Sequence, residues 1–402
     1  MDKVDLNDKE TWKIEPKQVE RAIKDGRHDA KNPIFNWRKV VAQESVRHER
    51  WNANRNVLAW KFLTGVEYND PEKFPYSAVI DRKLGVKDAM ALLRLHEDYI
   101  GQDQELYHSK SEGICRTTSH DSIVYNLTAD PTLTEAWKTL GRPCQSVFVP
   151  LYPLAGPAKG TAFTDPATAT KEHFAGTPAM FDYRADFTPH SVFSASNNAI
   201  DYLRGDELAK RTQLIQAEEE KFMKDRAAVT KKAAGLKGEE RMKFLHDYNQ
   251  KSYDHVLKIM QAENARLMPN KVKILADVVK ADGDGTVDFA LLGAKGHEVL
   301  SANMEATRAG MSANQLNSTR QWKNFAPAEK MVYKDVNNDG ITDVVFTFKA
   351  KDVTKGAVAG AAMDLWLYTQ INGHRVTGFD VVPVENDKVK MNKGARDGKG
   401  LL

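Results

Sequence analysis

The sequence feature that most constrains the fold is a change of hydrophobic periodicity at Pro269. Before it, two long segments, about Asp206–Ala234 and Gly238–Met268, carry apolar residues at helical spacing with charged residues between them. After it, short apolar runs follow the two-residue period of β-strands and are separated by turn residues such as DG and NG. The pattern predicts an α+β chain in which a helical hairpin covers a sheet and an all-β domain follows.

Composition and charge narrow the class of protein. Charged residues make up 28% of the 402 residues, as expected for a soluble globular protein. The 58 Lys and Arg residues nearly balance the 55 Asp and Glu residues, which argues against a nucleic-acid-binding face as the main function. The sequence contains no long apolar run, so we predict no membrane-spanning helix. Residues 1–16 are polar and acidic, unlike a secretory signal, so we expect no export signal in the chain as written.

The block between Tyr107 and Pro153 holds both cysteines, Cys115 and Cys144. A disulfide would require their segments to be neighbours, which spacing alone does not establish. We interpret them as two buried thiols that behave as small apolar side chains, and we expect no metal at either because neither lies in a CxxC pair. The block contains three β-like runs: Gly113–Thr117, Ser122–Leu127 and Ser146–Leu151.

Three runs, Ala89–Arg94, Ile114–Leu127 and Leu140–Tyr152, resemble segments of bacterial cysteine dipeptidases of the N-terminal-nucleophile hydrolase superfamily. The similarity covers about Trp12–Met268 and includes HSVFSASNNAIDYL, residues 190–203. The resemblance implies a four-layer αββα sandwich in which a cysteine at the mature N-terminus attacks a peptide carbonyl. Its own α-amino group, which titrates near neutrality, takes the proton. The resemblance also implies dipeptides or short peptides as substrates and an extracytoplasmic or secreted location.

The chain departs from this family at the nucleophile. It begins Met1-Asp2-Lys3, and Cys115 lies inside the chain, where it has no α-amino group to offer. We therefore expect the nucleophile and the first strands upstream of Met1, with this chain as the C-terminal part of the hydrolase, inactive alone. A truncated sheet would expose unpaired strand edges, so the missing N-terminal segment or a homo-oligomer is the expected partner. The alternative is a non-catalytic extracellular binding or structural protein that keeps the hydrolase scaffold.

Arginines are the candidate site residues of this part of the chain. Arg55, in the run NANR, looks like the arginine that lies beside the attacking sulfur in this family. Its other interpretation is a surface arginine in a charged segment. Arg116 could bind a substrate carboxylate, because a guanidinium group matches the geometry of a carboxylate. Arg116 and Arg142 could equally be structural ion-pair partners, and for Arg142 we favour that interpretation.

A loop in the all-β part has the beginning of a calcium-binding pattern. An oxygen-rich calcium loop of the EF-hand type would place Glu at its twelfth position. Counted from Asp335, that position in this chain is Phe346, which lies in a predicted strand. Two interpretations stay open, a calcium site and a hairpin turn that needs no ion. We expect no cofactor for catalysis. Acidic and amide side chains occupy positions one, three, five and nine of the loop: Asp335, Asn337, Asp339 and Asp343.

These patterns divide the chain into three parts. Residues 1–268 are predicted to form a dipeptidase-like α/β hydrolase domain that lacks its N-terminal strands and its nucleophile. Residues 269–384, with several short strands at regular spacing, are predicted to form an immunoglobulin-like β-sandwich. Residues 385–402 are polar and rich in Lys and Gly, and we expect this tail to be disordered.

Overall fold

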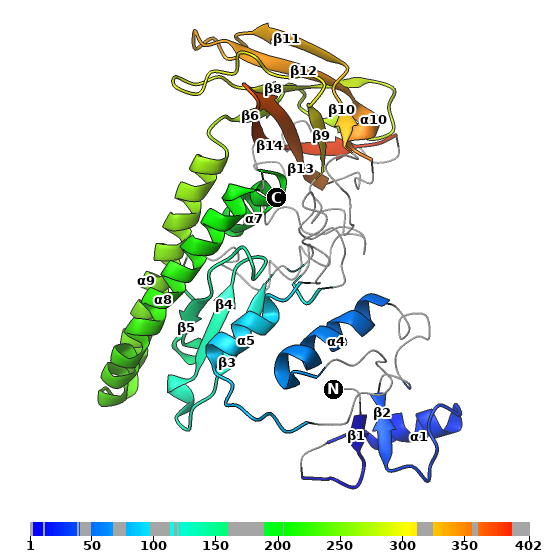
Figure 1. The fold of residues 1–402 in the computed structure, drawn as a ribbon, viewed down its shortest axis with the longest axis vertical. Coiled ribbons are helices and arrows are strands. Elements are labelled where there is room, and N and C mark those ends of the chain that lie inside the picture. The colour runs from blue at the N-terminus through cyan, green and yellow to red at the C-terminus, as the bar shows by residue number, and fades with distance from the viewer. Residues whose placement is uncertain are drawn as a thin grey trace. The chain divides into compact units, whose positions relative to one another are not determined.

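The computed structural model of the 402-residue chain is mixed α+β, with helices and several separate sheets (Figure 1). It divides into two compact units, residues 1–99 with 110–116, and residues 100–109 with 117–402. Each unit is described by itself. The structure describes residues 3–10, 13–37, 40, 50–66, 78–96, 113–115, 119, 121–159, 189–203, 205–311, 325–355 and 361–387.

The first unit contains a small two-stranded antiparallel sheet and short helices. Phe35, in the second strand, is fully buried and packs with Ala22 and Val40. A proline begins the first helix, where its missing N–H group has no intrahelical acceptor to lose. The elements are β1 (Lys3–Asp5), α1 (Pro16–Lys24), β2 (Ile34–Asn36), α4 (Arg50–Thr64) and α5 (Val86–Leu93).

The strand predicted over Gly113–Thr117 is not formed at residues 113–115, which bend instead. The backbone N–H of Cys115 donates to the carbonyl of Leu95, just after α5, at 3.0 Å. This hydrogen bond joins the segment to the end of a helix. The amide is therefore not available to a neighbouring strand, and the remaining residues of the predicted run, 116 and 117, lie outside the described residues.

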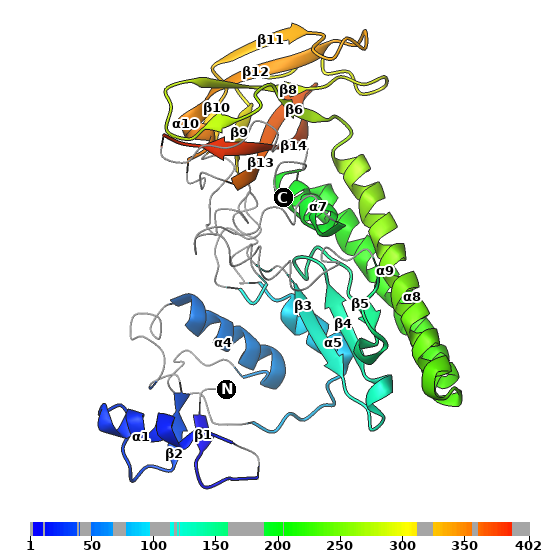
Figure 2. The same ribbon diagram turned by 180° about the vertical axis from the view of Figure 1, so that it is seen from behind.

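The second unit begins with a three-stranded antiparallel sheet in the order β3-β4-β5. The long helices α8 and α9 form a hairpin alongside this sheet, as both ribbon views show (Figures 1 and 2). The helical hairpin predicted from the sequence is thus confirmed in both of its segments. The elements are β3 (Ser122–Asn126), β4 (Glu135–Thr139), β5 (Val149–Leu151), α7 (Pro189–Leu203), α8 (Asp206–Gly235) and α9 (Gly238–Leu267).

The chain after α9 forms two sheets that share one apolar core, which makes this region a β-sandwich. One sheet has the order β10-β9-β13-β14-β7, with β7 parallel to β14, and the other has the order β11-β12-β8-β6. A short helix, α10 (Ala350–Val353), follows β12. The strands are β6 (Val272–Ile274), β7 (Val279–Lys280), β8 (Thr286–Leu291), β9 (Arg308–Met311), β10 (Ala326–Pro327), β11 (Lys330–Lys334), β12 (Asp343–Lys349), β13 (Ala361–Ile371) and β14 (His374–Glu385).

Alternation along β13 explains how this sandwich joins the helices. Leu365 and Leu367 point into the core between the two sheets. Trp366 and Tyr368 belong to a second cluster, which contains Tyr202 of α7; the rings of Tyr202 and Trp366 have centroids 5.6 Å apart. The sandwich therefore packs its outer face against α7, within the same compact unit as the helices.

Candidate functional site

The turn between β4 and β5 is held in place by side chains from α7. Gly141, in this turn, has a φ of 150°, which favours glycine. A Cβ atom at this position would lie 2.3 Å from the terminal amide group of the Asn197 side chain. The hydroxyl of Thr139 donates to the carbonyl of Gly141 at 2.9 Å and accepts from the N–H of Ser122 at 2.9 Å. The turn thus links strands β3 and β4 to the asparagines of α7.

Arg142, the next residue, is 1% exposed. Its Nη2 donates to Oδ1 of Asn198 at 2.7 Å. The side-chain amide of Asn197 donates to the carbonyl of Gln145, and its oxygen accepts from the N–H of Arg142 and from Oγ of Ser146, each at 3.1 Å. A buried guanidinium group needs such partners because leaving it without acceptors costs free energy. The cluster therefore joins the β4–β5 turn to α7.

The outer edge of β5 is bound by helix side chains. The N–H of Phe148 donates to Oε1 of Glu219 at 2.8 Å, and the N–H of Tyr152 donates to Oδ1 of Asn249 at 2.7 Å. Nδ2 of Asn249 donates in return to the carbonyls of Tyr152 and Gly156, both at 3.0 Å. The two bonded residues, Phe148 and Tyr152, flank β5, which covers Val149–Leu151 of the predicted run. The contacts also satisfy backbone groups that would otherwise require another strand.

An ion pair between the buried carboxylate of Glu135 and the partly exposed guanidinium group of Arg226 joins β4 to α8. Glu135 is 2% exposed, and its two carboxylate oxygens lie 2.8 and 2.7 Å from Nε of Arg226. Trp137 Nε1 and Asn126 Nδ2 each donate to Oε2 of the same carboxylate at 3.2 Å. Because the charge of Glu135 is compensated and its oxygens accept several hydrogen bonds, this group holds the sheet to the helix.

Charged side chains also line the contact between α8 and α9. Burial would raise the pKa of Glu218, but hydrogen bonds from Lys221 and His255 outweigh it and hold that pKa below its usual range. Nε2 of His255 lies 2.7 Å from Oε2 of Glu218. Arg211 is fully buried, and burial lowers its pKa to about 10. Its Nη1 donates to Sδ of Met260 at 3.2 Å. The helix pair thus contains titratable groups whose pKa depends on the fold.

The structure places one of the two predicted site arginines. Arg55 lies in α4, is partly buried and donates from Nε to the carbonyl of Gly113 at 3.1 Å. It therefore contacts the backbone of the run that contains Cys115. Arg116 lies outside the described residues. Neither Cys115 nor Cys144 is in a disulfide. The roles given to Arg55 and Arg116 stay predictions.

In the predicted calcium loop, the side chains bind the loop's own backbone. The carboxylate of Asp335 accepts from the N–H groups of Asp339 and Gly340, at 3.2 and 2.9 Å. The carboxylate of Asp339 accepts from Nδ2 of Asn337 and from the N–H of Ile341, both at 2.8 Å. These contacts are those of an Asx-type turn.

Asp343, the last of the four predicted ligands, is fully buried at the start of β12. Its Oδ1 accepts from the N–H of Gly293 and its Oδ2 from the N–H of Val336, both at 2.8 Å. The carboxylate therefore joins the loop to the segment after β8. Calcium binding by this loop stays a prediction, and so does the hairpin that needs no ion.

Sequence reasoning did not single out the helix residues that bind the β4–β5 segment. Asn249 of α9 lies between the buried residues Leu245 and Tyr253, each four positions away. A polar side chain within an apolar helical stripe is the signal that could have identified it. Asn197 and Asn198 give a similar signal, because they lie among buried residues of α7.

Comparisons with known proteins leave the family of this chain open. No family model matches the sequence, and no curated protein matches it. The resemblance to cysteine dipeptidases therefore rests on the sequence runs given above. Among the described residues, no helix combines the length and the apolar character needed to cross a membrane.

Proposed function

We propose that this chain is part of a peptide-bond hydrolase of the cysteine dipeptidase type. The observation that carries the proposal is a contact between two segments that separately resemble this family. Leu140–Tyr152 contains Arg142, and residues 190–203 contain Asn198; these two side chains, 56 positions apart, form a buried hydrogen bond of 2.7 Å. The bond shows that the two segments pack against each other, and this supports the proposal that both belong to one domain.

The two cysteines of this chain do not provide the nucleophile that the proposed mechanism requires. In an N-terminal-nucleophile hydrolase, the α-amino group of the nucleophile is the general base. Both cysteines of this chain are internal, and the nitrogen of Cys115 is an amide that donates to Leu95. Neither cysteine can therefore act as its own base, and the proposed nucleophile is a cysteine that this chain does not carry.

The test is a hydrolysis assay with the purified 402-residue chain and a panel of dipeptides. The assay is run with and without a thiol-alkylating reagent, and with and without a cysteine-headed N-terminal segment supplied as a second polypeptide. We expect no turnover by the chain alone and turnover by the mixture. Alkylation of the added segment should abolish that turnover, because the thiolate is the nucleophile.

Two outcomes would contradict the proposal in different ways. Alkylation-sensitive turnover by the chain alone would identify Cys115 or Cys144 as the nucleophile, and the assignment to another cysteine would be wrong. Absence of turnover in every mixture would favour the second candidate function, a non-catalytic binding protein on the same scaffold. The amide bond of Cys115, which removes the expected base, is the observation that favours this second function. The immunoglobulin-like type of the sandwich and a secreted location stay predictions.

A further inference from the structure

The turn between β13 and β14 is the two-residue loop Asn372-Gly373, one of the NG and DG turns that the sequence predicts. The two strands pair up to Ile371 and His374, so only these two residues connect them. The φ angles of Asn372 and Gly373 are 51° and 77°, and positive values at both positions are those of a type I′ turn. Both residues are exposed. The loop is therefore a short, solvent-facing turn that fixes the register of the strand pair.

The sequence Asn-Gly favours a reaction between the asparagine side chain and the backbone. The nitrogen of the next residue attacks Cγ of the side chain, and glycine leaves that nitrogen unshielded because it has no Cβ. In this chain, Asn372 is the one asparagine that glycine follows. A Cβ atom built on Gly373 would meet no heavy atom within 4 Å apart from its chain neighbours. The space around the attacking nitrogen is therefore open.

The two reacting groups are not held by the protein. In the described part of the chain, no hydrogen bond involves the side-chain amide of Asn372, and none is donated by the backbone N–H of Gly373. A buried or hydrogen-bonded amide would have to lose its partner before it could react, which costs free energy. Here the attack requires no hydrogen bond within the protein to be broken.

Asn338 provides an internal comparison, because it is also exposed and has a positive φ of 58°. The next residue is Asp339, whose side chain shields its backbone nitrogen. The N–H of Asp339 also donates to Oδ1 of Asp335 and to Oδ1 of Asn337, both at 3.2 Å. The nitrogen that follows Asn338 is therefore shielded and hydrogen-bonded, whereas the nitrogen that follows Asn372 is neither.

We propose that Asn372 is a site of spontaneous covalent modification. The nitrogen of Gly373 bonds to Cγ of Asn372, the bond between Cγ and Nδ2 breaks, and Nδ2 leaves as ammonia with the proton of the Gly373 amide. Water then opens the cyclic succinimide. Opening at Cγ gives aspartate, and opening at the backbone carbonyl carbon gives isoaspartate, in which the chain runs through the side-chain carbon. Either product carries a negative charge that asparagine lacks.

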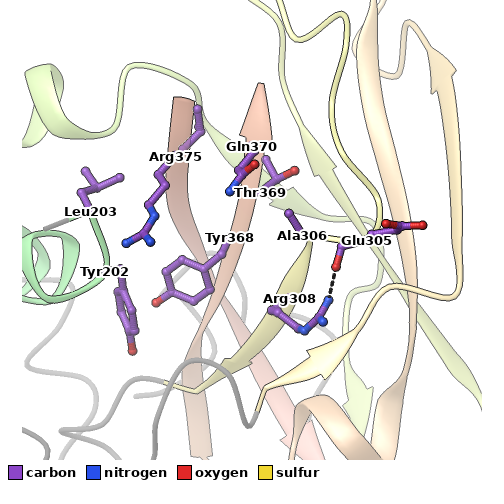
Figure 3. Close-up of a pocket in the computed structure, with 10 residues that line it drawn as sticks. Tyr202, Leu203, Glu305, Ala306, Arg308, Tyr368, Thr369, Gln370 and Arg375 are labelled. Carbon is purple, nitrogen blue, oxygen red and sulfur yellow. Dashed lines mark hydrogen bonds between the residues drawn. The ribbon is translucent and has the colours of Figure 1, made fainter. Parts of the chain in front are cut away.

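Isoaspartate lengthens the backbone of the turn by one carbon atom. A two-residue turn has no spare residue to absorb this change, so the adjacent end of the hairpin should loosen. Gln370 and Arg375 pair near that end. Both line a cavity of about 270 Å³, to which Tyr202 of α7 and Arg308 of β9 also contribute (Figure 3). The modification therefore alters one wall of this cavity. The reaction needs neither cysteine and does not depend on the proposed hydrolase function.

The experiment is incubation of the full chain in mildly alkaline buffer, because the attacking nitrogen reacts after it has lost its proton. Peptide mapping by mass spectrometry and labelling with protein isoaspartyl methyltransferase identify the product. Over the time in which the denatured chain is half converted at Asn372, we expect product at Asn372 of the folded chain and none at Asn338. Asn372→Gln should abolish the product at this position, since the longer side chain cannot form the same ring. Asn338→Gln should leave the modification of Asn372 unchanged.

The effect on the hairpin is measured on the modified protein, which its added charge separates on an ion-exchange column. The isoaspartate fraction should show faster amide hydrogen exchange at the turn end of β13 and β14 than the unmodified protein, with unchanged exchange in β8 and β12. Absence of product at Asn372 in the folded chain, or equal product at Asn338, would overturn the proposal. Unchanged exchange at the turn end of the hairpin would overturn the expected effect on the cavity wall.

Discussion

The helix-covered sheet and the β-sandwich, both in the second unit, are stabilised in different ways. In the helix-covered sheet, buried polar groups such as Arg142, Glu135 and Asn249 hold the strands to the helices. In the sandwich, the centre is a continuous apolar cluster, in which Phe289 and Phe346 are fully buried. One region therefore depends on specific long-range hydrogen bonds, and the other depends mainly on buried apolar area.

The difference follows from the partners to which each region hydrogen-bonds its backbone N–H and C=O groups. Strands of the sandwich pair with one another, so its interior consists mostly of apolar side chains. The sheet β3-β4-β5 has few strands, and beyond β5 the carboxylate of Glu219 and the amide of Asn249 take the place of a neighbouring strand. A sheet completed by helix side chains is sensitive to single polar substitutions, whereas a sandwich is most sensitive to loss of volume.

The largest expected effect is in the core of the sandwich. Phe289→Ala should lower the free energy of unfolding by about 3–5 kcal/mol, since it removes a fully buried ring and leaves a cavity. The ring of Phe289 lies edge-on to Phe348, with centroids 5.2 Å apart, so part of an aromatic contact is lost too. Denaturant unfolding followed by fluorescence and circular dichroism measures the change.

The matched control for this prediction is Val332→Ala on the exposed strand β11. Val332 is 37% exposed, so its truncation should cost less than about 1 kcal/mol. If both substitutions lowered the free energy of unfolding by the same amount, the apolar core would not be what stabilises the sandwich.

A smaller loss of stability is expected from substitution in the polar cluster that joins α7 to the β4–β5 turn. Asn198→Ala removes the acceptor that lies 2.7 Å from Nη2 of Arg142 and leaves that buried donor without it. The expected loss is about 1–3 kcal/mol, with faster amide hydrogen exchange in β4 and β5 than in the strands of the sandwich. Gln213→Ala, at an exposed position of α8, is the control. It should change neither the free energy of unfolding nor the exchange rates of β4 and β5. Uniform exchange throughout the unit would argue against separate modes of stabilisation.

The smallest effect concerns pH. The pKa of Glu218 is lower in the folded protein than its ordinary value near 4.5. Its stabilising contribution is therefore complete above about pH 4.5 and is lost as pH falls through the folded-state pKa. We expect increased hydrogen exchange in α8 and α9 on acidification before the sandwich responds. Glu218→Gln should reduce this dependence, and an unchanged acid response of the variant would contradict the assignment.

Local patterns in the sequence predicted the elements that are regular over many residues. The helices Asp206–Gly235 and Gly238–Leu267 agree with their predicted ranges, because periodicity over eight turns is a strong signal. The strand predicted over Gly113–Thr117 was wrong at residues 113–115. There, hydrogen bonds from Cys115 to Leu95 and from Arg55 to Gly113 hold the segment, and the local sequence does not indicate either of them.

By itself, the sequence determined the α+β class, the helical hairpin and the change to strands after Pro269, because each depends on the spacing of apolar residues along the chain. Only the tertiary structure decided that Asn198 reaches Arg142 and that Arg308 and Arg375 share one cavity. Those contacts depend on strand register and on helix orientation. Both are set by packing between segments far apart in the sequence, where local periodicity carries no information.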